Sequence, residues 1–316
     1  MSICLTTYNR AHVLPASLDS LLAQTYGDFE LIISDDCSTD TTAQICRDYE
    51  RRDSRVKYFC NATNLKMPGN LNAAIGRATG HYIANLHDGD VFRPDLIALW
   101  KAALDAQPRA GFVFNQYHSF DRQGRPQVDR APLEDHPDAH EIARHFFRTF
   151  TSCVWGTVMV RREAYAAVGP FNPEYGFISD VDMWLRLSRD REVAYVAEPL
   201  ITITPREPDH PYEFVHWRLW FWTFAMYTAH LELYRDVLPR EVADYRARYP
   251  QRCRALLLRS LLICLKHRRF DRLREGLAIW RDSSDPLLRS LGRAIGRASD
   301  APAWYSPEQW QRTEAG

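Results

Sequence analysis

Short apolar runs alternate with amphipathic segments along the first 90 residues, and this alternation constrains the fold more than any other feature. The apolar runs have the length of buried strands, whereas the segments between them carry leucines at helical spacing. Three strand–helix–strand units in succession predict an α/β fold: a parallel sheet with helices on both faces and right-handed connections. The expected strands are residues 3–6, 29–34, 56–59 and 82–86, and the expected helices are residues 14–24, 40–52 and 70–78.

Polar loops follow the expected strands, and in a parallel sheet such loops meet at one edge. Residues 7–10, the pair Asp35-Asp36 and residues 87–90 should therefore converge on a binding cleft. The sequence lacks Gly-x-Gly-x-x-Gly after its first strand and lacks Gly-x-x-x-x-Gly-Lys-Ser/Thr, which argues against dinucleotide oxidoreductases and P-loop enzymes. A nucleotide could still be held by carboxylates and amides. Asp36 could accept a base imide N–H, or it could cap its own turn, and Tyr8 could lie against a base.

The fourth expected strand runs directly into the turn His87-Asp88-Gly89-Asp90, which holds two carboxylates around a glycine. Such a pair suits Mn²⁺ or Mg²⁺, because these ions accept one or two carboxylates and complete their shell with water and substrate phosphates. A metal at this turn would therefore predict a phosphorylated substrate. Asp-Gly is also common turn chemistry, so an ordinary turn remains the alternative on the local sequence alone.

The composition argues against several classes of protein. Lys and Arg total 40, and Asp and Glu also total 40, so no basic excess makes a nucleic acid the expected partner. The seven cysteines form no Cys-x-x-Cys pair, which predicts reduced thiols in a cytoplasmic protein rather than zinc or a disulfide framework. The first residues begin a strand rather than a signal peptide, and the apolar stretch 217–231 is too short and interrupted to span a bilayer.

Four stretches carry a family resemblance: residues 6–10 (TTYNR), residues 18–26 (LDSLLAQTY), residues 34–40 (SDDCSTD) and residues 80–84 (GHYIA) before the acidic turn. In order and spacing they resemble the family 2 glycosyltransferases, and the resemblance extends over about the first 205 residues. It implies a GT-A fold, Rossmann-like with a mostly parallel central sheet, for a catalytic domain at 1–205. The nucleotide-sugar half would occupy about 1–92, the acceptor half about 93–205, and a C-terminal α-helical region 206–316.

In that family the first two loops hold the nucleoside of a sugar nucleotide, and the acidic turn binds a divalent metal on its diphosphate. The resemblance thus implies Mn²⁺ or Mg²⁺ at Asp90 and Asp88. The family often has a His or Arg after its sheet that faces the diphosphate, which makes His210 a further metal-site candidate beside Arg206. The residues implied to bind the nucleotide or sugar are Thr6, Tyr8, Asn9, Arg10, Asp36, Asn64, Asn72 and Asp88.

The acidic turn is also where the chain departs from the family, whose turn commonly reads Asp-x-Asp-Asp. A gapless match sets His87 and Gly89 against the two spaced acids, so only Asp90 falls on an acidic position. Asp90 is therefore the expected main ligand and Asp88 a phosphate-side or sugar-side partner, unless the register shifts by one residue. The same departure supports a second hypothesis, a non-catalytic protein that binds a nucleotide sugar or a glycan.

Residues 177–187 (FISDVDMWLRL) predict a buried helix whose first turn carries Asp180 and Asp182. Helix capping would account for one of these acids. The family shows Glu-Asp-x-Asp-x-Trp-Leu-Arg-Leu here, so the resemblance implies that Asp180 is the base of an inverting transfer to a hydroxyl of a glycan or lipid-linked glycan. Ser179 replaces the family's Glu. Trp155 and Gly156 would face the same cleft, toward acceptor or sugar, or Trp155 would lie in the core.

Two short edge strands are expected at 193–196 and 200–204, after which residues 205–211 break regular structure and the pattern becomes helical. Aromatic residues between 214 and 227 recur at helical spacing, which fits packing on the catalytic domain or a lipid or partner interface. The basic run 266–269 could touch anionic lipid or a charged acceptor, or lie at a solvated helix end. We expect a cytoplasmic protein whose C-terminal helices can make peripheral contact with the inner face of the membrane.

Overall fold

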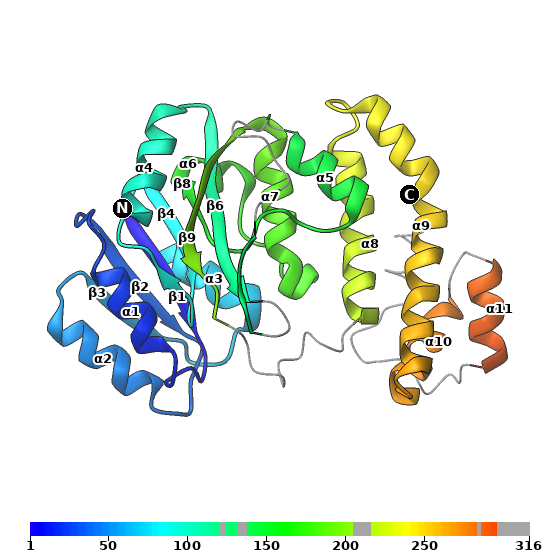
Figure 1. The fold of residues 1–316 in the computed structure, drawn as a ribbon, viewed down its shortest axis with the longest axis horizontal. Coiled ribbons are helices and arrows are strands. Elements are labelled where there is room, and N and C mark those ends of the chain that lie inside the picture. Colours follow the sequence, from blue (N-terminus) through cyan, green and yellow to red (C-terminus); the bar gives the residue numbers. More distant parts are fainter. Residues whose placement is uncertain are drawn as a thin grey trace. The chain divides into compact units, whose positions relative to one another are not determined.

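The computed structural model of the chain describes residues 1–120, 124–129, 131, 138, 140–204, 216–282 and 286–295. The chain divides into two compact units, Met1–Arg206 and Glu207–Gly316. The described part of the first unit combines a sheet with helices, and that of the second unit is helical (Figure 1).

A sheet with strand order β3-β2-β1-β4-β8-β6-β9-β5 organises the first unit, and β7 pairs with β6 outside this path. β1 pairs in parallel with β2 and β4, β2 with β3, and β6 with β9, whereas β8 is antiparallel to both β4 and β6, β5 to β9 and β7 to β6. Most paired residues of the sheet belong to parallel pairs, as the resemblance implied. Its strands are β1 Ser2–Thr7, β2 Glu30–Asp35, β3 Val56–Cys60, β4 Tyr82–His87, β5 Val91–Phe92, β6 Ala110–Phe120, β7 Pro126–Asp129, β8 Val158–Arg161 and β9 Glu192–Thr202.

Helices lie against both faces of this sheet. Ile3 and Leu5 of β1 belong to one hydrophobic core with the leucines of α1, while Cys4 between them is equally buried and points to the opposite face. The residues of β1 are thus buried on both sides, which is typical of a parallel sheet between helices. The helices of this unit are α1 Leu14–Leu22, α2 Thr42–Arg52, α3 Lys66–Arg77, α4 Leu96–Ala106, α5 Glu141–Thr149, α6 Arg162–Val168, the 3₁₀ helix η1 Pro173–Ile178 and α7 Ser179–Asp190.

The prediction of two edge strands after α7 is wrong. The structure has one strand there, β9, which lies between β6 and β5 instead of at the edge. Its register against β6 shifts near Gln116, opposite Pro199. A bulge of this kind lets a strand continue past a proline that cannot donate to the ladder, and the sequence pattern reads the proline only as a break.

The second unit contains α8 His216–Leu233, α9 Pro239–Lys266, α10 Phe270–Trp280 and α11 Pro286–Ile295. Aromatic side chains of α8 are buried against its neighbours: Trp217 meets Trp280 edge-to-face at 5.6 Å, and Tyr227 stacks on Tyr249 at 4.4 Å between centroids. These aromatic residues therefore form the core of their own unit. In the described residues, no helix is both long and apolar enough to cross a membrane.

Candidate active site

The loops that follow β1 and β2 lie together at one edge of the sheet, as predicted. The backbone N–H of Asn9 donates to Ser38 Oγ at 2.9 Å, and Asn9 Oδ1 accepts from the backbone N–H of Thr39 at 2.8 Å. The backbone N–H of Arg10 donates to Thr42 Oγ1 at 3.1 Å. Asn9 has a φ of 52°, a left-handed conformation that asparagine tolerates better than most residues. The side chain of Asn9, a predicted nucleotide ligand, thus joins the two loops.

Asp36 is buried and connects a third loop to the same edge. Its Oδ1 accepts from Asn61 Nδ2 at 3.1 Å and from the backbone N–H of Leu65 at 2.7 Å, and its Oδ2 accepts from the backbone N–H of Lys66 at 2.8 Å. Asn64 Oδ1 accepts from the same Lys66 N–H at 2.9 Å. A carboxylate offers about four acceptor positions. Asp36 could therefore accept a base N–H while it keeps its hydrogen bonds to the backbone N–H groups of Leu65 and Lys66.

Three other predicted ligands, Tyr8, Thr6 and Asn72, differ in exposure and in the contacts that they make. Tyr8 is 46% exposed, so its ring face is available for stacking, and Thr6 is half-buried in register with His87 of the neighbouring strand β4. Asn72 uses both ends of its amide on the backbone of Phe171: Nδ2 donates to the carbonyl at 2.9 Å, and Oδ1 accepts from the N–H at 2.9 Å. This contact gives Asn72 a structural role in fixing the segment before η1.

The turn after β4 is held by a side chain that the sequence analysis did not single out. Ser17 Oγ, buried on α1, accepts from the backbone N–H of Gly89 at 2.9 Å and donates to the carbonyl of Asp90 at 2.7 Å. Gly89 has a φ of +86°, which favours glycine. Asp90 is buried, and Asp88 Oδ1 lies 3.8 Å from Arg10 Nε, so Arg10 brings positive charge to the Asp88 carboxylate.

Asp180 lies close to His87 at the end of β4, although the two are 93 positions apart in sequence. A Cβ placed on Gly156 would be 2.6 Å from His87 Cε1 and 3.7 Å from Asp180 Oδ2. Gly156 therefore leaves the space that the imidazole occupies, and the carboxylate borders the same space. The neighbouring Trp155 is 47% exposed and meets Tyr117 edge-to-face at 5.3 Å, so it is not a core residue.

Burial raises the pKa of Asp180 from 3.8 to about 6, against the opposing effect of the Val181 backbone N–H, which donates to Oδ1 at 2.8 Å. Protein surrounds the carboxyl, but the residue keeps some exposed surface. A carboxylate with a pKa near 6 on a residue that keeps some exposed surface has the properties of a general base.

Asp182 has a different role from Asp180. It is buried, and its Oδ2 pairs with Arg186 at 2.8 Å one turn later on α7. Arg186 also donates to the carbonyls of Val168 at 2.6 Å and Pro170 at 2.9 Å. Asp182 thus anchors the arginine that fixes the turn after α6, and only Asp180 borders the space beside Gly156.

The carboxylates after β4 fit a divalent cation that takes much of its coordination shell from its substrate. No group of three or more His, Cys, Asp or Glu side chains able to hold a metal occurs in the part of the chain that the structure describes. Mg²⁺ and Mn²⁺ do not require one, because one or two carboxylates together with phosphate oxygens and water suffice. Asp90 and Asp88 meet that requirement. His210 and Arg206, the other candidates, lie outside the described residues.

Comparison with known proteins identifies the family. The family model described as Glycosyl transferase family 2 matches residues 2–169, more than half of the chain. The putative glycosyltransferase EpsE of Bacillus subtilis is 30% identical over 189 residues, which are 59% of this chain and 66% of EpsE. WfgD of Escherichia coli, a UDP-Glc:α-D-GlcNAc-diphosphoundecaprenol β-1,3-glucosyltransferase, is 24% identical over 62% of this chain and 72% of its own length. The chain thus covers just under two thirds of EpsE.

Solved structures share the fold. Residues 1–349 of Staphylococcus aureus TarS, in complex with UDP-GlcNAc, match with a TM-score of 0.65 at 16% identity, over 99% of this chain and 90% of that one. The mannosyltransferase PcManGT of Pyrobaculum calidifontis, in complex with GDP-Man and Mn²⁺, matches with a TM-score of 0.55 at 15% identity, over 99% and 83%. The chain has the GT-A fold and belongs to glycosyl transferase family 2.

Proposed function

We propose that this chain is an inverting glycosyltransferase that moves a sugar from a nucleoside diphosphate donor to a hydroxyl of a glycan or lipid-linked glycan. The observation that carries the proposal is the position of Asp180, whose carboxyl has a pKa raised to about 6 and borders the same space as His87 at the end of β4. The family membership supplies the reaction class.

In the proposed mechanism, Asp180 accepts the proton of the acceptor hydroxyl as that oxygen attacks the anomeric carbon. A bond forms between the acceptor oxygen and the anomeric carbon, and the bond from that carbon to the diphosphate oxygen breaks with its electron pair. Attack from the face opposite the leaving group inverts the configuration. A retaining double displacement would need a second carboxylate near the anomeric carbon, whereas Asp182, the nearest acid in sequence, is engaged by Arg186.

The diphosphate would bind at the turn after β4, where Asp90 and Asp88 would hold Mn²⁺ or Mg²⁺. When bound, such an ion offsets the negative charge that develops on the departing diphosphate. Arg10, 3.8 Å from Asp88, adds a positive charge beside the same turn. Ser17 would keep the carboxylates in position through its bonds to Gly89 and Asp90.

We assign nucleotide-sugar binding to residues 1–92 and acceptor binding to residues 93–205. The exposed ring of Tyr8 would stack on the base, and Trp155 would offer an open aromatic surface to the acceptor or sugar. TarS and PcManGT are described in complexes with UDP-GlcNAc and with GDP-Man, which supports a nucleotide sugar as donor here without selecting its base. The name of WfgD, which includes diphosphoundecaprenol, supports a lipid-linked acceptor.

Donor turnover by purified protein tests this function. We expect nucleoside diphosphate release from a panel of UDP- and GDP-sugars to require Mn²⁺ or Mg²⁺ and to fall by at least 100-fold in Asp180→Asn, since general-base catalysis contributes about 10²–10⁴-fold. Asp95→Asn is the matched control, because Asp95 is also a carboxylate at a helix N-terminus but pairs with Arg93 at the surface. Full turnover in Asp180→Asn would contradict the mechanism.

The second candidate function is a non-catalytic nucleotide-sugar or glycan-binding protein, which the replacement of two family acids by His87 and Gly89 favours. It predicts that a nucleoside diphosphate raises the unfolding temperature while no donor is consumed with any acceptor pool. Turnover that depends on Asp180 would exclude it.

A further inference from the structure

One exposed face of α9 in the second unit carries basic residues at helical spacing. Positions 248, 252, 255, 259, 262 and 266 follow one another in steps of four and three, so they line one side of the helix. All six residues are exposed. Ala255 and Leu262 lie within this face, which we call the α9 stripe, and its basic members are Arg248, Arg252, Arg259 and Lys266.

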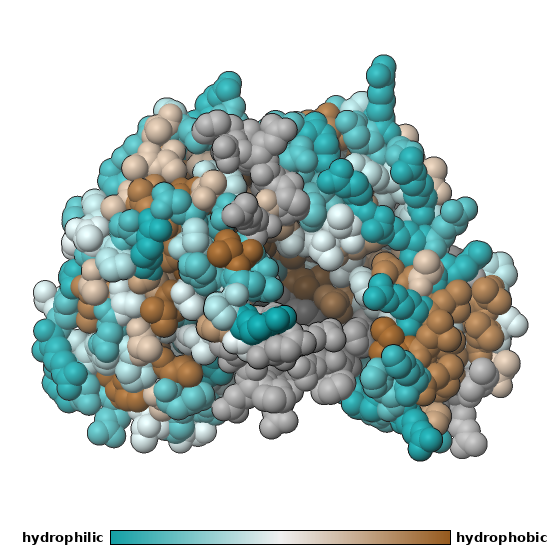
Figure 2. Space-filling model, viewed as in Figure 1, coloured by the Kyte–Doolittle hydropathy of each residue, from teal (hydrophilic) through white to brown (hydrophobic). Residues whose placement is uncertain are grey.

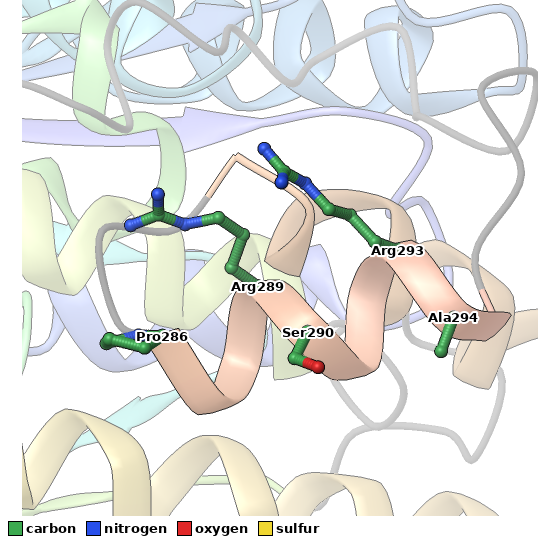
Figure 3. A pocket seen from close by; sticks show the side chains of 5 residues that line it. All are labelled: Pro286, Arg289, Ser290, Arg293 and Ala294. Atoms are coloured by element: carbon green, nitrogen blue, oxygen red, sulfur yellow. The ribbon is translucent and has the colours of Figure 1, made fainter.

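The sequence around the α9 stripe is strongly and uniformly basic. Between residues 245 and 270 the chain has eight Lys or Arg and no Asp or Glu, although the two charge types balance over the whole protein. Arg248, at the start of the stripe, pairs with Asp244 one turn earlier at 2.9 Å, so the excess is greatest toward the C-terminal half of the helix. Two further arginines, Arg289 and Arg293, project from one side of α11 and line a pocket in the same unit (Figure 3).

Large apolar side chains are exposed at the same end of α9. Leu262 is 64% exposed, Leu265 45% and Phe270 54%, and Lys266 lies between them in sequence. Figure 2 shows hydrophobic surface bordered by hydrophilic residues over the lower part of the second unit. Single exposed apolar residues are ordinary, but three within nine positions beside a basic stripe mark an interaction surface.

We infer that the α9 stripe binds the surface of a membrane that contains anionic lipid. Basic residues of the stripe would contact the headgroups, while Leu262, Leu265 and Phe270 would enter the boundary between headgroups and acyl chains. A soluble anionic polymer would account for the arginines but would leave these three apolar side chains in water. The inference rests on the proposed function, which supplies the membrane-bound acceptor. It gives the second unit the role of bringing the enzyme to that acceptor.

Vesicle binding tests the inference without donor or acceptor, so its failure and the failure of the proposed transfer are distinguishable. The full chain is sedimented with phosphatidylcholine vesicles that contain either no phosphatidylglycerol or 30% phosphatidylglycerol. We expect binding only to the anionic vesicles, weakening as salt is raised. Arg259→Gln with Lys266→Gln should lower the partition coefficient by about 30-fold, at about 1 kcal/mol for each residue.

Two further variants separate this surface from charge in general. Arg51→Gln with Arg52→Gln on α2 removes the same charge from exposed positions of the first unit, and it should bind vesicles as the wild type does. Leu262→Ser with Phe270→Ser keeps every charge and should remove the binding that persists at high salt. Unchanged thermal unfolding shows that each variant is folded.

The inference fails if the wild type does not bind anionic vesicles, or if the α9 charge variant and the α2 charge variant lose binding equally. It also fails if the apolar variant binds as tightly as the wild type. Binding to soluble dextran sulfate without binding to vesicles would identify a polyanion site in place of a membrane surface.

Discussion

Replacement of Gly156 by alanine tests whether the close approach of β4 and the segment before β8 shapes the site. The new Cβ would lie 2.6 Å from Cε1 and 2.7 Å from Nε2 of His87. Carbon atoms in contact prefer about 3.5–4.0 Å, so the imidazole would have to retreat by about 1 Å. Overpacking of this kind costs about 1–3 kcal/mol, and we expect the lower end, because the contact involves the far end of a side chain that can turn.

The effect on turnover should exceed the effect on stability. The new methyl group would displace the ring within the space that Asp180 borders, and a misplacement of about 1 Å at a reacting site can lower the rate about 100-fold. We therefore expect kcat/KM to fall by about that factor while the free energy of unfolding falls by about 1 kcal/mol. Urea unfolding and a coupled assay of nucleoside diphosphate release measure the two quantities on the same preparation.

A double-mutant cycle identifies the contact that is responsible. In a His87→Ala background the clash is absent, so Gly156→Ala should cost little further stability, with a coupling energy of about 1 kcal/mol. Gly76→Ala is the control, because its Cβ would meet nothing within 4 Å. Equal destabilisation in both backgrounds, or wild-type turnover in the single variant, would refute the reasoning.

Three further predictions follow from the site. Turnover should rise with pH through about 6 as Asp180 ionises. Because folding raises the pKa of this carboxyl, the free energy of unfolding should fall as pH rises from 3.8 to about 6. Above that pH range Asp180→Asn should recover at most about 3 kcal/mol, measured by urea unfolding at pH 5 and 7.5. Arg186→Ala leaves buried Asp182 without its arginine partner and should destabilise by about 3 kcal/mol while the pH midpoint of turnover stays unchanged. Ser17→Ala should cost about 1–3 kcal/mol and raise the Mn²⁺ concentration needed for half-maximal turnover, because it releases the turn that carries Asp90.

The sheet could be predicted from sequence where local pattern and final environment agree. The first four strands are short apolar runs separated by helices, and each lies within a residue or two of its predicted range. β9 could not be predicted as one strand, because its continuity depends on a bulged pairing with β6, more than 70 residues away in sequence. The pattern of a strand contains no information about a partner that compensates for its proline.

The position of Ser17 on α1 is a sequence feature that indicates a buried hydrogen bond. Ser17 occupies the apolar side of α1 with Leu14, Leu18 and Leu21, and all four residues are buried. A hydroxyl on a buried helix face requires a hydrogen-bond partner, because an unpaired one is costly. The sequence could therefore have indicated that α1 faces polar backbone, although it could not have named Gly89 and Asp90 as the partners.

The two acids of α7 show how helix geometry separates roles that the sequence makes look alike. Asp180 and Asp182 are both in the first turn, and both satisfy the preference for acids near a helix N-terminus. Two residues along an α-helix correspond to a rotation of about 200°, so the side chains leave opposite sides of the helix. On one side of the helix, Asp182 pairs with Arg186, and this ion pair has a structural role. The other side borders the space left by Gly156, where burial raises the pKa of Asp180 toward that of a useful base.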